Sequence, residues 1–141
     1  MSSIDLQQVK KQLIDAGLEI YRTKESELEI AERIRLHIMD SGVRVRADLS
    51  VVFTARSQRS DFPSVAPDDL FEKVRTTIGP QAQERGYAEE ASQTVDVRDP
   101  MDDAKVLDTW HEVVYVKSAS ELPVVVEEVR WALGLERYVS T

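Results

Sequence analysis

Apolar and polar side chains alternate along residues 43–56 with a single exception. The seven odd positions from Val43 to Ala55 are all apolar, and Val52 is the only apolar residue at an even position. Successive side chains of a β-strand point to opposite faces of the sheet. The pattern therefore predicts one long strand over Val43–Arg56, with an apolar face and a polar face, in a sheet that is covered on one side.

Four segments have the spacing of an amphipathic helix, in which apolar residues recur three and four positions apart. Capping signals support three of them. Ser26 and Glu29 have the spacing of a capping box, Pro67 fits a first turn and Ser120 fits an N-cap. The predicted helices are residues 4–16, 26–40, 67–85 with a break at Gly79-Pro80, and 121–133.

Three further segments favour strands. Leu18–Arg22 alternates briefly, and Thr94–Arg98 and Trp110–Lys117 are rich in β-formers. The last segment has apolar residues on both faces, which predicts an interior strand. The polar connection over residues 99–108 contains Pro100 and predicts a long, exposed hairpin loop.

These elements follow one another in the order α-β-α-β-α-β-β-α. We expect an α+β fold, a two-layer sandwich in which helices cover one face of a mostly antiparallel sheet of three to four strands. The length of 141 residues and the absence of an obvious linker predict a single domain over residues 1–141.

The charge and composition of the chain indicate which kinds of binding partner and which cellular compartment to expect. The net charge of −8 disfavours nucleic acid as a partner. The chain has no cysteine, which excludes a disulfide framework and thiolate metal sites and fits a reducing compartment. The sequence shows neither a signal peptide nor an apolar run long enough to cross a membrane. We therefore expect a cytoplasmic protein.

No spacing of residues identifies a catalytic or metal site. A nucleophile elbow and a phosphate-binding glycine loop are both missing, and Tyr115 stands where a zinc-protease motif beginning at His111 needs its second histidine. The acid-rich segment around Asp102 lacks the calcium-loop pattern and is expected to be solvated. We expect no cofactor and no metal. An acid–base enzyme needs only two well-placed carboxylates, so whether the protein is an enzyme stays open.

Five side chains are candidates for a ligand pocket against the sheet. Arg44, Arg46 and Arg56 share the polar face of the predicted long strand, and guanidinium groups bind phosphates and carboxylates. His111 and Tyr115 lie on a neighbouring predicted strand. Such a pocket would indicate an enzyme or a small-ligand-binding protein. The alternative is a solvated face whose arginines pair with acids of adjacent strands.

The last predicted helix is apolar on two sides. One side carries a regular core stripe, whereas Val124, Trp131 and Leu135 project roughly the opposite way. Exposed aromatic residues with apolar neighbours are typical of interfaces. We therefore expect a small binding or regulatory protein that acts through protein–protein contacts, as a homo-oligomer or with another protein. Alternatively, residues 136–141 fold back over Trp131. A subunit of a larger assembly is a third hypothesis, from size and fold class alone.

Overall fold

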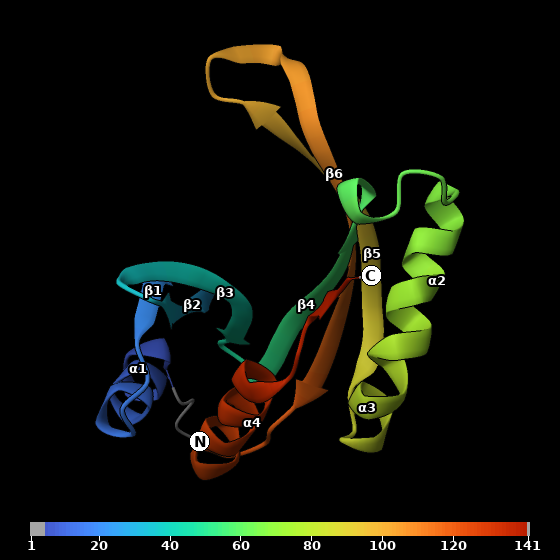
Figure 1. The fold of residues 1–141 in the computed structure, drawn as a ribbon. Helices are drawn as coiled ribbons and strands as arrows, with labels where there is room; N and C mark the ends of the chain where they lie inside the picture. Colours follow the sequence, from blue (N-terminus) through green and yellow to red (C-terminus); the bar gives the residue numbers. More distant parts are fainter. Residues whose placement is uncertain (1–4, 141) are drawn as a thin grey trace. The chain divides into compact units, whose positions relative to one another are not determined.

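A computed structural model describes residues 5–140 of the chain (Figure 1). Within these residues it has four α-helices, one short 3₁₀ helix and seven strands. In chain order they are α1 (Leu6–Asp15), β1 (Ile20–Thr23), β2 (Glu27–Ile34), β3 (His37–Arg46), β4 (Ser50–Gln58), η1 (Arg59–Asp61), α2 (Pro67–Thr77), α3 (Gly79–Glu84), β5 (Ala88–Asp99), β6 (Asp102–Ser118), α4 (Leu122–Gly134) and β7 (Tyr138–Val139).

The observed sheet differs from the expected one in its number of strands and in the order of its elements. The strands are hydrogen-bonded in the order β1-β2-β3-β4-β6-β5, and β7 pairs with β4 in parallel. The sheet is mostly antiparallel and the class is α+β, as expected. The prediction of three to four strands is wrong, because the described residues form seven. The predicted element order is also wrong, because four strands follow the first helix before the next helix begins.

The predicted helix over residues 26–40 is instead the hairpin of β2 and β3. Ile34 faces His37 across a turn in which Arg35 has a φ of 60°. Ile30, Ile34 and Ile38 are spaced by four, which fits a helix, but a spacing of four also fits one face of a strand, as for Ile30 and Ile34 on β2, and Ile38 lies beyond the turn on β3. Isoleucine is β-branched and favours strands, and the cross-strand pairing decides the outcome.

The predicted long strand over Val43–Arg56 is also two strands. β3 ends at Arg46 and β4 begins at Ser50, with Leu49 at a φ of 67° and the Ser50 N–H donating to Asp48 Oδ1 at 2.9 Å. Val45 then pairs with Val51. Odd-numbered residues lie on the same face of the sheet before and after this turn. The alternation of apolar and polar residues therefore continues unchanged, and the sequence pattern gives no sign of the turn. The apolar face itself is confirmed, because its members on both strands are buried.

Most of the predicted loop over residues 99–108 is strand. Only Pro100 and Met101 connect β5 to β6. β6 lies between β4 and β5 in the sheet, which confirms the interior strand predicted at Trp110–Lys117. α1 and α4 confirm the helices predicted at 4–16 and 121–133, although residue 4 lies outside the described residues, and the break at Gly79-Pro80 separates α2 from α3. The N-cap of α4 is Glu121 rather than Ser120.

Two compact units divide the chain. The first unit comprises Met1–Phe53 and Val116–Leu135, and the second comprises Thr54–Tyr115 and Glu136–Thr141. The expectation of a single domain stays a prediction. None of the helices described is long and apolar enough to cross a membrane.

In the first unit, α1 and α4 pack on one another and on the β1–β3 strands. Asp5 caps α1 by accepting the Gln8 N–H at 2.9 Å, and the Gln8 side chain accepts the Asp5 N–H in return. Buried apolar residues of both helices and of the strands form one core. Its members include Val9, Leu13, Leu28, Ile30, Val43, Val45, Val51, Phe53, Val125, Val129 and Ala132.

In the second unit, α2 and α3 supply the helical side of the core. Pro67 starts α2, and Asp68 and Asp69 follow it at the positive end of the helix dipole. Ser57 Oγ of β4 donates to the Leu70 carbonyl of α2 at 2.8 Å, which ties strand to helix. The buried apolar residues here include Ala55, Leu70, Val74, Ile78, Ala82, Val113 and Tyr115.

Candidate functional site

Two of the five predicted ligand residues lie in the first unit. Arg44 faces Glu29 across β2 and β3, and Arg46 faces Glu27. The pKa of Asp48 is lowered mainly by its hydrogen bonds with Ser50, and the charge of Arg46 lowers it further. Both arginines are therefore placed opposite acids on a neighbouring strand, as the solvated-face alternative expects.

Arg56 lies in the second unit, stacked on an aromatic ring. Its guanidinium carbon is 4.0 Å from the centre of the Trp110 ring, and its Nε is 3.8 Å from Glu112 Oε2. Gln93 Nε2 donates to the other oxygen of Glu112 at 2.9 Å. Stacking on Trp110 and the ion pair with Glu112 give Arg56 partners within its own unit.

His111 and Tyr115 point to the opposite face of β6 from Glu112. The His111 ring meets Phe71 of α2 edge-on at 5.0 Å, and the Tyr115 hydroxyl lies beside Gly79. The two predicted faces of this strand are therefore confirmed. None of the five residues lines the groove or the smaller hollow described below, so a pocket formed by them stays a prediction.

The buried His111 predicts a pH dependence of stability. Its exposed fraction is 2%, and among the described residues its Nδ1 has no hydrogen-bond partner. Burial lowers its pKa below the usual 6.5; the charge of Arg59 adds to this, and Asp108 opposes it. Because protonation is easier in the unfolded chain, stability is complete above about pH 6.5 and falls as pH decreases below it.

Replacing His111 by glutamine is expected to remove the part of the acid-induced loss of stability that His111 causes. Melting temperatures between pH 7 and pH 5 test it, with the exposed His37→Gln as matched control. The wild type and His37→Gln are expected to lose stability more steeply than His111→Gln. Equal slopes for all three proteins would show that His111 does not titrate with unfolding.

A second polar cluster links three strands of the first unit. Glu29 is buried, and its Oε1 lies 3.5 Å from Lys24 Nζ and 3.7 Å from Arg22 Nε. A hydrogen bond with the Asp40 carboxyl is the largest cause that raises the pKa of Glu29, followed by burial. The two cations oppose that shift. The cluster acts as a structural polar network between neighbouring strands.

The predicted interface on α4 is packed in part within its own unit. Trp131 meets Phe53 edge-on, with ring centres 5.9 Å apart at an interplanar angle of 68°. Val124, Trp131 and Leu135 are all half-buried. An interface at these three residues stays a prediction, and the packing on Phe53 already gives Trp131 a role in the core.

Large apolar side chains are exposed at three places in the described part of the chain. They are Ile14 and Tyr21 beside the first strand, Ile34, Leu36, Ile38 and Met39 at one hairpin end, and Met101, Val106 and Leu107 at another. Scattered exposed apolar residues are ordinary, whereas grouped ones mark interaction surfaces.

The first hairpin end is the basic tip, defined here as residues 33–39, where β2 turns into β3. It contains Arg33 and Arg35, no acidic residue and four exposed apolar side chains. Leu36 is 94% exposed at the turn. Arg35 holds a left-handed conformation there that usually favours glycine or asparagine. This turn therefore presents apolar and basic side chains to solvent without the residues that form such turns most readily.

The second hairpin end is the acidic arm, defined here as residues 94–107 of β5 and β6. It extends beyond the helices of its unit (Figure 1). The arm contains four aspartates, one arginine and one lysine, so its formal charge is −2. Every residue from Ala88 to Leu107 is exposed or half-exposed, and Met101 is 92% exposed at the turn. Two-stranded hairpins are marginally stable alone in water, so this arm is a candidate for contact with a partner.

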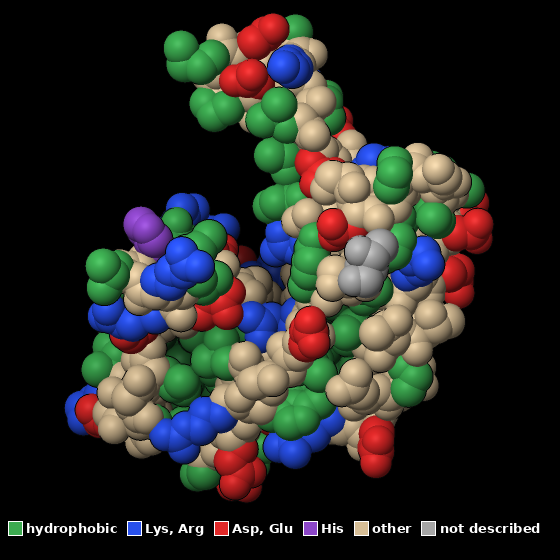
Figure 2. Space-filling view, viewed as in Figure 1, with side chains coloured by type: hydrophobic (Ala, Val, Ile, Leu, Met, Phe, Trp, Pro, Cys, Tyr) green, Lys and Arg blue, Asp and Glu red, His purple; other side chains and the backbone are tan. Residues whose placement is uncertain are grey.

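Figure 2 shows both hairpin ends as mixed surfaces. Hydrophobic side chains lie among acidic ones at the end of the β5–β6 hairpin and among basic ones at the end of the β2–β3 hairpin. Mixed apolar and charged surfaces of this kind are what protein partners bind: the apolar part contributes affinity, and the charges contribute orientation and specificity.

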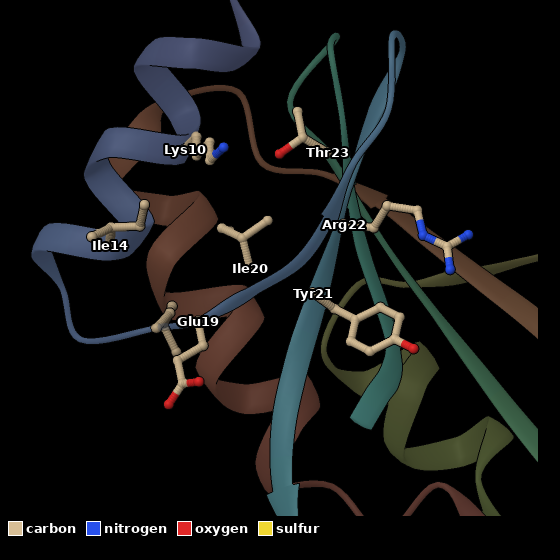
Figure 3. Close-up of a pocket in the computed structure, with 8 residues that line it drawn as sticks. Lys10, Ile14, Glu19, Ile20, Tyr21, Arg22 and Thr23 are labelled. Carbon is tan, nitrogen blue, oxygen red and sulfur yellow. The ribbon is translucent and has the colours of Figure 1, made fainter. Parts of the chain in front are cut away.

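The third place is a groove between α1 and the edge strand β1 (Figure 3). The groove has a volume of about 470 Å³ and is open to solvent. Eight residues between Lys10 and Thr23 line it. Ile14 and Ile20 supply apolar walls, Lys10 and Arg22 supply positive charge, and Glu19 supplies one negative charge, which pairs with Arg33. A smaller hollow of about 190 Å³ lies in the second unit beside Tyr138. Burial and then the hydrogen bond to Asp61 raise the pKa of Tyr138 to about 12.

Sequence reasoning missed the tip and the groove; within the arm it predicted a strand at Thr94–Arg98 and interpreted residues 99–108 as a loop. The available signal for the tip was the run of apolar residues from Ile34 to Met39, interrupted by basic side chains. Among the residues described, no group of three or more histidine, aspartate or glutamate side chains is placed to hold a metal ion. No family model matches the sequence, and comparison with curated proteins and with solved structures gives no match.

Proposed function

We propose that this protein is a small acidic cytoplasmic binding protein that acts through protein–protein contacts and associates with itself. One observation carries the proposal. Seven of the nine exposed large apolar side chains of the described chain are grouped at the ends of two hairpins. Burying them against a partner removes apolar surface from water at about 25 cal/mol per Å².

The charges beside these apolar groups favour binding to a specific partner over nonspecific aggregation. Each hairpin end combines apolar side chains with charge of a single predominant sign. Like charges oppose indiscriminate aggregation, whereas a complementary surface gains both electrostatic and apolar contact. This arrangement favours a regulated or stoichiometric association.

Sedimentation velocity over a wide concentration range tests the proposal. The wild type is expected to shift from monomer to a discrete oligomer as concentration rises, and Leu36→Ser is expected to weaken that association by about tenfold or more. Leu36 is exposed, so its replacement leaves the core intact. A wild type that stays monomeric at the highest attainable concentration would contradict self-association.

The same experiment with Trp131→Ala distinguishes the hairpin ends from the helical interface. Association that survives Leu36→Ser but is lost in a folded Trp131→Ala variant would place the interface on α4. Circular dichroism of each variant confirms that it is folded, since Trp131 also packs on Phe53.

The groove beside β1 favours a second candidate function, the binding of an extended peptide. An exposed edge strand offers unpaired backbone groups to which an extended segment adds as a further strand. The apolar wall of Ile14 and the charges of Lys10 and Arg22 favour a segment that alternates apolar and acidic residues. A display library of random peptides selected on the wild type and counter-selected on Ile14→Asp tests this. A failure to enrich peptides that discriminate the two proteins would reject it.

A further inference from the structure

We propose that the basic tip of one copy binds the acidic arm of a second copy of this chain. This inference rests on the proposed function, because it names the partner and the surfaces through which the protein associates with itself. It assigns residues 33–39 and residues 94–107 as the two halves of one intermolecular contact.

The charges of the two surfaces select this pairing. The tip carries Arg33 and Arg35 and no acid of its own; Arg33 pairs with Glu19 of the same chain, so Arg35 contributes most to the basic character of the tip, and the arm carries a formal charge of −2. A contact between two arms would place aspartates against aspartates, and a contact between two tips would bring arginines together. Like charges brought together at an interface are unfavourable, so tip against arm is the only one of the three pairings that is complementary.

The apolar side chains of the two surfaces complete the match. Leu36 and Ile38 of the tip, and Met101 and Leu107 of the arm, are each about half exposed or more. Both surfaces are hairpin ends with the most exposed apolar residue at the turn. Contact between them removes apolar surface from water on both sides, and methionine adapts readily to the shape of a partner.

A two-fold arrangement uses the contact twice. The tip of each copy then meets the arm of the other, which closes the assembly as a dimer and leaves neither surface unpaired. The contact is partly electrostatic, so its affinity is expected to fall as salt concentration rises. The apolar part keeps the dimer detectable at moderate ionic strength.

Charge reversal on each surface tests the pairing. The tip variant carries Arg35→Glu and His37→Glu, and the arm variant carries Asp102→Lys and Asp103→Lys. All four positions are exposed. In sedimentation velocity each variant alone is expected to associate at least about tenfold more weakly than the wild type. An equimolar mixture is expected to recover a heterodimer, because both of its tip–arm contacts are complementary again.

Net charge does not explain that recovery. From the wild-type charge of −8, the tip variant becomes −8 − 3 = −11 and the arm variant −8 + 4 = −4, so both remain negative and repel at long range. A control variant with Glu84→Lys and Glu127→Lys has the same −8 + 4 = −4 on exposed helical positions. It is expected to associate at least as well as the wild type.

The outcomes separate this inference from the proposed function. A monomeric wild type would reject self-association as a whole. A wild type that dimerises, together with reversal variants that dimerise equally well or a mixture that stays monomeric, would overturn the tip–arm contact and leave self-association standing.

Discussion

Replacing Phe53 by alanine is expected to lower the free energy of unfolding by about 3–5 kcal/mol. Phe53 is fully buried on β4, faces Val43 across the sheet and packs edge-on against Trp131 of α4. Alanine removes the whole ring and leaves a cavity between the strands and the helix, because close-packed cores collapse only in part. Urea-induced unfolding followed by circular dichroism measures the loss.

Two matched variants test whether the loss of stability comes from the cavity in the core. Phe53→Leu keeps most of the apolar volume and is expected to cost about 1 kcal/mol. Val106→Ala, on the exposed acidic arm, is expected to change stability by less than about 0.5 kcal/mol. If Phe53→Ala destabilised the protein no more than Val106→Ala, the assignment of Phe53 to the core would be wrong.

Replacing Lys117 by methionine is expected to cost about 2–3 kcal/mol. Lys117 Nζ lies 3.1 Å from Glu128 Oε2, and the Glu128 side chain is only 3% exposed. The variant leaves a buried carboxylate without its lysine. Lys117 itself is 24% exposed, so water replaces part of the lost interaction and the expected effect lies below that of a fully buried pair.

The double variant Lys117→Met/Glu128→Met provides the control. Replacing both members of a buried ion pair by apolar residues of similar size is often neutral or stabilising. Equilibrium unfolding of the two single variants and the double variant gives the coupling energy between the residues. If the double variant lost as much stability as the sum of the single variants, the two side chains would be energetically independent.

The four α-helices observed in the described residues were predictable because their signals are local, although the same kind of signal wrongly predicted a helix over residues 26–40. Pro67 and Gly79-Pro80 mark a helix start and a helix break within a few residues of the observed bounds. Amphipathic spacing then gave the buried faces of α1, α2 and α4. These features depend on neighbours within one or two turns, which the sequence displays directly.

The hairpins were less predictable because their turns lack the usual residues. Arg35-Leu36 contains neither glycine nor asparagine, and the turn before Ser50 preserves the alternation of the strands on either side. The polar residues after Asp99 have a composition typical of loops, yet they pair as strand in β6. Pairing between strands depends on distant residues, which local pattern alone does not reveal.

The candidate surfaces depend on exposure, which the sequence does not specify. Leu36 and Met101 are apolar residues that a sequence pattern assigns to a core or leaves unassigned. Their positions at hairpin turns expose them almost completely. The neighbours of the predicted arginines also depend on strand pairing, which places Arg44 and Arg46 opposite acids of β2.

Disulfide trapping between two copies tests the central claim most directly. The chain has no cysteine, so a single introduced cysteine reports on one site. Leu36→Cys and Met101→Cys proteins are mixed and oxidised, with Gln12→Cys on the exposed face of α1 as the control partner. The proposed contact predicts a linked heterodimer of Leu36→Cys with Met101→Cys, formed in preference to either homodimer and to any product with Gln12→Cys. Equal formation of all these products, or of none, would contradict it.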